Sequence, residues 1–264
     1  MNSLFQITFL GTGTSIGVPV IGCDCAVCTS DDPINNRTRS SIHIQTPELS
    51  LVVDTGPDFR DQCLREKITH LDAVLFTHAH SDHIMGFDDL RRFTVAADAN
   101  IDIYGHPETL TKLRTAFDYV FNGENHYVGY LKPVAHEIDG SFSLGDLEVT
   151  PLPVTHGKVD TIGFLFSQSG KKRLAYIPDA KTLSPETTEA IRDVEVLILD
   201  ALHDKPHPTH LSTSESIEIA QQANAAQTWF THFSCRVDHT IVAPTLPDGI
   251  QLSWDGLKIS STNE

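Results

Sequence analysis

Apolar residues fall along the chain in short runs and alternations that predict a mixed α/β protein. Phe5, Ile7 and Phe9 alternate with polar residues, as in a half-buried strand. Strands are predicted at 51–53, 73–76, 101–105, 174–177 and 195–200, and the apolar runs at 73–76 and 195–200 predict buried ones. Helices are predicted at 59–67, from 86 onward, at 107–118 and at 213–225. Because strands and helices mix throughout and no linker interrupts them, we expect one domain over residues 1–264.

Two hairpins and one irregular segment complete this outline. Strands at 162–166 and 173–177 flank Ser169-Gly170, and the segment 250–259 reads as a second hairpin with an Asp255-Gly256 turn. Residues 119–135 read as an irregular loop that shapes either the mouth of a pocket or a dimer contact. Its polar and aromatic residues include Tyr119, Asn125, His126, Tyr127 and Tyr130.

The buried strand at 73–76 leads directly into a cluster of metal-binding residue types. His78, His80, Asp82 and His83 fall within six residues, although the whole chain holds only 14 histidines. A tight loop at a strand end can turn all four side chains toward one point. Imidazole nitrogens and a carboxylate oxygen suit Zn, Mn or Fe. The segment therefore predicts a metal site.

The pattern His-x-His-x-Asp-His after an apolar strand resembles the metallo-β-lactamase superfamily. This resemblance implies an αββα sandwich, of the α/β class, with a two-metal site on one edge. The family also needs a later His, a later Asp and a last His, each at a strand end, and the matching residues here are His156, Asp179 and His232.

The resemblance also implies how the ligands divide between the metals, either Zn or Mn. One metal is expected on His78, His80 and His156. The other is expected on Asp82, His83 and His232, with Asp179 bridging the two. Asp54 matches the family's Asp that supports the ligands through hydrogen bonds.

A second metal site is predicted from the cysteines. Cys23, Cys25 and Cys28 lie within six residues and can wrap one tetrahedral Zn²⁺, which needs a fourth ligand. Cys235 is the candidate, and Cys63 is read as a small core residue. The insert near 22–28 resembles the Cys-x-Cys-x-x-Cys of the phosphoribosyl cyclic phosphodiesterase branch. That branch has a His where this chain has Cys235, so a structural Cys₄ zinc site is expected here.

Only a few further residues are expected to act beside the metals. Asp82 and His210 are the predicted catalytic residues. His210 precedes the capping box of Ser212 and Glu215, and it matches a His that the phosphodiesterase branch holds beside its metals. His203 and His207 read as loop residues. Arg37 and Arg91 are candidate contacts for a substrate phosphate, and the alternatives are a solvated face for Arg37 and pairing with Asp88 or Asp89 for Arg91.

Composition limits the partners. The chain has 264 residues and a formal net charge of −16, from 19 Lys and Arg against 35 Asp and Glu. Two divalent metals offset only about four of these charges. Because phosphate contacts need Lys and Arg, a nucleic acid polymer is a poor substrate, whereas a small phosphate ester is not excluded.

The sequence also gives expectations for location and assembly. No apolar run approaches about 20 residues, so no membrane segment is predicted. The N-terminal residues read as a strand rather than a signal peptide. The odd count of five cysteines argues against a disulfide framework, which favours the cytoplasm. A homodimer is expected from the resemblance alone.

Three functions follow from these observations. The first is a metal-dependent phosphodiesterase acting on a small, cyclic phosphate such as phosphoribosyl 1,2-cyclic phosphate, which the cysteine insert and His210 favour. The second is another hydrolase of the superfamily, for a thioester, lactone or β-lactam. The third is a non-catalytic relative, against which the full ligand set counts.

Overall fold

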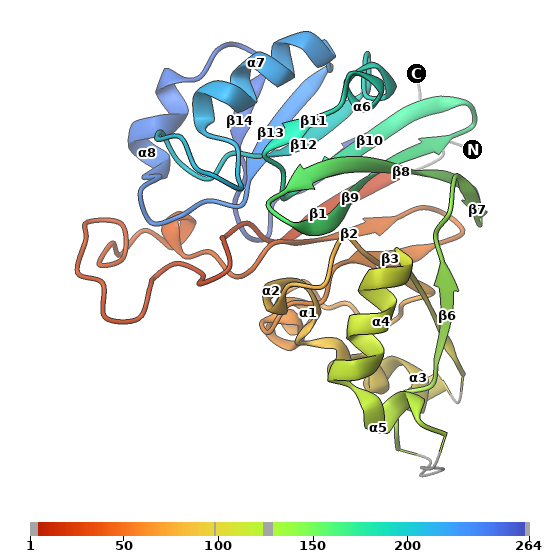
Figure 1. The fold of residues 1–264 in the computed structure, drawn as a ribbon. Coiled ribbons are helices and arrows are strands. Elements are labelled where there is room, and N and C mark those ends of the chain that lie inside the picture. Colours follow the sequence, from red (N-terminus) through yellow and green to blue (C-terminus); the bar gives the residue numbers. More distant parts are fainter. Residues whose placement is uncertain (1–4, 98, 124–128, 262–264) are drawn as a thin grey trace.

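The computed structural model describes residues 5–97, 99–123 and 129–261. Two sheets pack face to face, and helices cover the outer face of each (Figure 1). The chain therefore forms the αββα sandwich that the sequence predicts. Among the described residues, no helix has the length and apolarity to cross a bilayer.

The first sheet has seven strands in the order β15-β1-β2-β3-β4-β5-β6. Pairing is antiparallel from β15 to β3 and parallel from β3 to β6. The strands are β1 (Phe5–Gly11), β2 (Ser41–Gln45), β3 (Ser50–Val53), β4 (Ala73–Phe76), β5 (Ile101–Gly105), β6 (Pro133–Glu137) and β15 (Lys258–Ser261).

The second sheet has eight strands, seven of them in the order β11-β8-β9-β10-β12-β13-β14, with β7 beside β8. From β10 to β14 the pairing is parallel. The strands are β7 (Phe142–Leu144), β8 (Leu147–His156), β9 (Val159–Gln168), β10 (Lys171–Ile177), β11 (Thr182–Leu183), β12 (Val196–Asp200), β13 (Gln227–Thr231) and β14 (Ile250–Leu252). The predicted hairpin around Ser169-Gly170 is the β9–β10 hairpin.

Three layers of apolar side chains hold the sandwich together. The central layer lies between the sheets and includes Phe9, Leu75, Phe164 and Trp229. An outer layer packs the second sheet against α6 (Pro185–Ala190), α7 (Thr213–Ala223) and α8 (His239–Val242). The other packs the first sheet against α1 (Phe59–Glu66), α2 (Ser81–Ile84), α3 (Arg91–Ala97), α4 (Pro107–Ala116) and α5 (Asp118–Phe121). Short 3₁₀ turns lie at Pro33–Asn35, Phe87–Leu90 and Ala243–Thr245.

The predicted hairpin at 250–259 is wrong. β14 pairs with β13 in the second sheet, whereas β15 pairs with β1 in the first. The Asp255 carboxylate, which was expected to shape a local turn, accepts hydrogen bonds from the backbone N–H groups of Thr12 and Thr38. Long-range contacts thus direct the chain from one sheet to the other.

The segment 119–135 is less irregular than expected. Residues up to Phe121 form α5, and β6 begins at Pro133. The Tyr119 hydroxyl donates to an Asp88 carboxylate oxygen 2.5 Å away. Asn125, His126 and Tyr127 lie outside the described residues.

Candidate metal centre

The seven predicted ligands come from strand ends of both sheets. His78, His80, Asp82 and His83 follow β4 in the first sheet, and β4 is a buried apolar strand. From the second sheet, His156 ends β8, Asp179 follows β10 and His232 follows β13. Because these strands end at the same edge of the sandwich, residues as far apart in sequence as Asp82 and His232 become neighbours.

Three imidazole nitrogens form the first group. His78 Nε2 lies 2.9 Å from His80 Nδ1, which in turn lies 3.3 Å from His156 Nε2. Ligand atoms around a tetrahedral Zn²⁺ are about 3.3 Å apart, by the usual Zn–N length. The His156 ring is fixed because its Nδ1 lies 2.9 Å from the Thr209 carbonyl oxygen, which turns Nε2 toward the other two rings.

Two histidines and two carboxylates form the second group. His83 Nε2 lies 3.3 Å from Asp82 Oδ2 and 3.1 Å from Asp179 Oδ2. His232 Nε2 lies 3.2 Å from the other oxygen of Asp179. That same Oδ1 is 3.8 Å from His156 Nε2 in the first group. Asp179 therefore stands between the groups, as a bridging carboxylate must.

Asp54 orients the side chain of His83 and the backbone at Thr77 through hydrogen bonds. It is fully buried, and its carboxylate accepts hydrogen bonds from the Thr77 N–H and hydroxyl and from His83 Nδ1, each at 2.8 Å. Since Nδ1 of His83 donates to Asp54, Nε2 is the nitrogen that faces the centre. Gly56 lets α2 approach β3 closely, because a Cβ there would lie 2.2 Å from the Asp82 carbonyl oxygen.

The electrostatics of the centre favour a positive charge. Burial alone would lower the pKa of His83, but Asp179, Asp82 and Asp54 raise that pKa well above its usual value. For Asp179, the nearby His232 and His83 outweigh burial and hold the pKa well below its ordinary range. Burial lowers the pKa of His78, His80 and His156, which keeps these imidazoles neutral, the form that binds metals.

The residues present fit a metal centre on geometry as well. His83 Nε2, Asp179 Oδ2 and His232 Nε2 are buried and make no hydrogen bond within the described part of the chain. Buried polar atoms without partners are costly, and a coordinated cation would satisfy all three. Nitrogen and carboxylate oxygen donors suit Zn or Mn.

His210 and Asp200 form a pair at the edge of this centre. His210 Nδ1 lies 2.8 Å from Asp200 Oδ2, which also accepts the Ala180 N–H. Burial lowers the pKa of His210 and raises that of Asp200. The pair therefore shares a proton between Nδ1 and Oδ2, and Nε2 is the nitrogen of His210 that remains free to contact a ligand in the cavity.

A cavity of about 370 Å³ opens over the predicted metal ligands. Besides His210 and five of the predicted ligands, its lining contains Ser15, Gly157, Lys158, Val159, His207 and Thr209. Lys158 was not predicted as a site residue. The one feature of the sequence that points to it is its place two residues after the predicted ligand His156. His207 lies in a loop, as expected, and it also lines this cavity, with its ring centroid 5.3 Å from that of His210.

Neither arginine proposed as a phosphate contact lines this cavity. Arg37 is 1 % exposed, and its guanidinium lies over the Phe233 ring and donates to Asn35 and to the Ser234 carbonyl. Arg91 is exposed and pairs with Asp88 at 3.4 Å, which was its alternative role. The structure thus replaces the predicted substrate contacts by a packing role for Arg37 and a surface ion pair for Arg91.

The four cysteines near the chain ends also come together. The sulfurs of Cys23, Cys25, Cys28 and Cys235 all lie within 4.8 Å of one another. A hydrogen bond from the Cys28 N–H helps to lower the pKa of Cys25 to about 7, whereas burial raises that of Cys28 to about 12. Four thiolates therefore cannot coexist here without a cation, and a tetrahedral Zn²⁺ fits this donor set.

The fold and this site define a hydrolase of the metallo-β-lactamase type, a fold that generally binds divalent metals such as Zn. Residues 50–233 match the family model described as beta-lactamase superfamily domain. The chain belongs to this superfamily.

Similar proteins include members of several branches. A crystal structure described as a new diphosphatase from the PhnP family is 37 % identical, with a TM-score of 0.90 over 99 % of both chains. The Zn²⁺-bound PqqB of Methylobacterium extorquens shares the fold at 20 % identity and a TM-score of 0.80, over 96 % of this chain and 99 % of that one.

A protein named octanoyltransferase from Porphyromonas gingivalis is 35 % identical over 94 % of this chain. The match covers 50 % of that protein, so the chain spans about half the length of this relative.

Proposed function

We propose that the protein is a metal-dependent hydrolase of small phosphate esters, and that a phosphodiester is its substrate. A cyclic phosphate such as phosphoribosyl 1,2-cyclic phosphate is the example we favour. The observation that carries the proposal is the convergence of seven ligand side chains beside the His210–Asp200 pair. The likeness to a PhnP-family diphosphatase, at 37 % identity over nearly the whole of both chains, supports phosphorus chemistry over thioester or β-lactam chemistry.

The ligands divide as the geometry suggests. His78, His80 and His156 would hold one metal, and Asp82, His83 and His232 the other, with Asp179 between them. When bound, two such metals supply a nucleophilic hydroxide at neutral pH and stabilise charge on the phosphoryl oxygens.

The protein's own residues contribute position and proton transfer. Asp54 keeps His83 in the tautomer whose Nε2 faces the centre. Asp200 holds the ring of His210 by Nδ1, so that Nε2, when protonated, can donate its proton to the leaving alkoxide. Asp82 takes part as a ligand that faces the cavity.

We further propose that the Cys₄ cluster holds one structural Zn²⁺. A closed shell of four thiolates leaves no position for water, so this ion would join the loop at 23–28 to the segment after β13 without taking part in the reaction.

The experiment that tests the function combines metal analysis with hydrolysis assays on bis(p-nitrophenyl) phosphate, a thioester and a β-lactam. We expect about three metals per chain, two in the centre and one on the thiols. Hydrolysis of the diester alone supports the proposal, and a panel of cyclic phosphates then identifies the substrate. Cleavage of only the thioester or the lactam would overturn it, and so would inactivity after reconstitution with Zn or Mn.

A further inference from the structure

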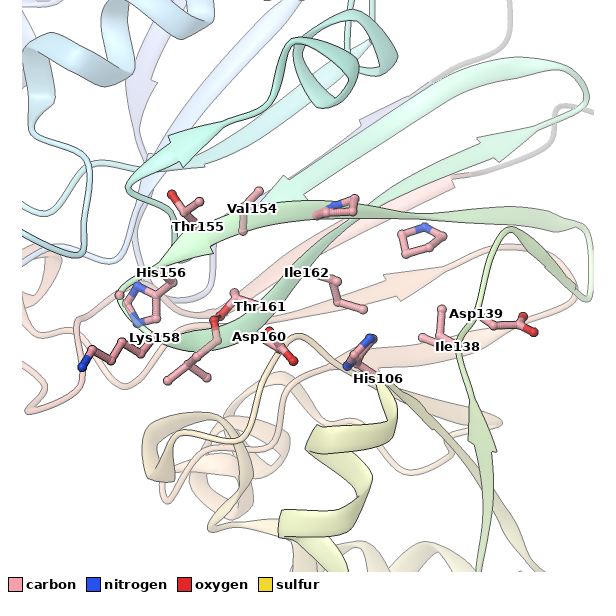
Figure 2. A pocket seen from close by; sticks show the side chains of 14 residues that line it. His106, Ile138, Asp139, Val154, Thr155, His156, Lys158, Asp160, Thr161 and Ile162 are labelled. Carbon is pink, nitrogen blue, oxygen red and sulfur yellow. Dashed lines mark hydrogen bonds between the residues drawn. The ribbon is translucent and has the colours of Figure 1, made fainter.

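A second, larger cavity adjoins the catalytic one. It is a groove of about 650 Å³ beneath the β8–β9 hairpin, and Figure 2 shows the side chains that line it. The segment from His156 to Val159, at the tip of this hairpin, lines both cavities. The two cavities therefore adjoin at the hairpin tip.

Lys158 stands at the junction of the two cavities. It is exposed, and among the residues that line either cavity it is the one Lys or Arg. In a chain with a net charge of −16, this cation is the local group that can attract a substrate anion. Figure 2 shows it at one end of the groove, beside His156.

The rest of the groove has a different character. Ile138, Ile162 and two prolines give it apolar walls, and Asp139 and Asp160 place two carboxylates along it. His106, between them in Figure 2, has a buried Nδ1 that makes no hydrogen bond within the described residues. Carboxylates repel phosphates and accept hydrogen bonds from hydroxyl groups, and the imidazole adds one more polar partner.

We propose that this groove receives the hydroxyl-bearing part of the substrate, of the size of a sugar or nucleoside, while Lys158 contacts a phosphate oxygen at the junction. The proposal rests on the proposed function and adds to it the place in the fold where the group joined to the phosphate lies. The volume of the groove is within the range of small-molecule sites, about 300–1,000 Å³.

Lys158 is tested with a dinucleoside monophosphate as substrate. Lys158→Ala should lower kcat/KM about tenfold or more, because a hydrogen bond to a charged group is lost. Metal content should stay the same, and Lys158→Arg should retain most of the activity. The matched control is Lys171→Ala, which removes an exposed lysine outside both cavities and should change kcat/KM by less than about twofold. If Lys158→Ala behaves like Lys171→Ala, the role of Lys158 is refuted.

The groove is tested by filling it. Asp160→Trp places a ring in the groove from an exposed strand position, and Glu148→Trp makes the same change on β8 outside it. The ratio of kcat/KM for a dinucleoside monophosphate to that for methyl p-nitrophenyl phosphate should fall about tenfold in the Asp160 variant, the loss of one substrate-specific contact. It should not change in the Glu148 variant. An unchanged ratio in both variants would overturn the proposal.

A binding measurement separates this proposal from the proposed function. Adenosine and ribose are titrated into the metal-loaded protein, and binding is followed by calorimetry. Binding of either probe to the wild type, lost in Asp160→Trp, supports the groove even if no phosphate ester is hydrolysed. Binding of ribose alone identifies a sugar site, and binding of adenosine alone a nucleoside site. If neither probe binds, the groove does not recognise the proposed group.

Discussion

Asp54→Asn is the substitution that most directly tests how the metal centre is held. The carboxylate of Asp54 accepts three hydrogen bonds of 2.8 Å, one of them from His83 Nδ1. Asn is nearly the same size, and it tolerates the left-handed backbone that Asp54 adopts at φ 66°. The backbone should therefore remain in place, and the change falls on the hydrogen bonds.

The new amide cannot satisfy all three donors. If its oxygen accepts the Thr77 N–H, its NH₂ group faces His83 Nδ1. The ring must then accept at Nδ1 and carry its proton on Nε2, the nitrogen needed for the metal. Loss of such a supporting partner typically costs 10- to 100-fold in metal affinity. We therefore expect the metal dissociation constant to rise by about that factor, or about 1.4–2.7 kcal/mol.

The affinity is measured by competition with a chromogenic chelator at fixed pH. Asp72→Asn is the matched control, because Asp72 also accepts a backbone N–H, from Ser50, and contacts a histidine, His70, outside the metal centre. Equal metal affinities in the Asp54 variant, the Asp72 variant and the wild type would refute the argument that Asp54 sets the tautomer of His83.

Three further predictions concern other parts of the molecule. Cys235→Ser should lose one zinc per chain and lower the melting temperature, whereas Cys63→Ser should keep the full zinc content; unchanged stoichiometry in the first variant would reject the fourth ligand. His210→Ala should lower kcat about 10²-fold or more with metal content intact, and wild-type turnover would remove His210 from the reaction. Burial lowers the pKa of His43 to about 4, so the unfolded chain binds more protons between pH 6.5 and 4, and stability falls as the pH falls through this window. Between pH 7 and pH 5 the free energy of unfolding, measured with urea, should fall by about 2 kcal/mol less in His43→Gln than in the wild type. An equal fall in both proteins would contradict this role of His43.

The convergence of the candidate ligands could be predicted from sequence because most of them follow an apolar strand. A buried strand ends where its apolar run ends, so the polar residue that follows lies at the edge of the sheet. His78 after β4 and His232 after β13 both follow this rule. The family resemblance indicates that these strand ends lie at one edge of the sandwich. With that information, local patterns are enough to predict which residues form the site.

Features that depend on distant partners could not be predicted in this way. Arg37 is preceded by polar residues and reads as a surface arginine, yet Phe233 and Ser234, almost 200 positions away, bury it. Asp255-Gly256 is a sound local turn signal, but the strands on either side pair in different sheets. For Lys158 the sequence offers only its closeness to His156, and its proposed role comes from where the β8–β9 hairpin tip lies.

The distribution of charge connects the metal centre to the proposed substrate. Asp54, Asp82, Asp179 and Asp200 are all buried in or beside the centre, within a chain whose net charge is −16. Asp54 and Asp200 each hold a histidine by its Nδ1, so these charges orient imidazoles and also repel anions. An anionic substrate would then bind where cations compensate, at the proposed metals and at Lys158. Since Asp139 and Asp160 extend the negative field along the groove, the groove favours the hydroxyl-bearing part of a sugar or nucleoside ester, whose phosphates stay at the proposed metals and Lys158, over a polyanion.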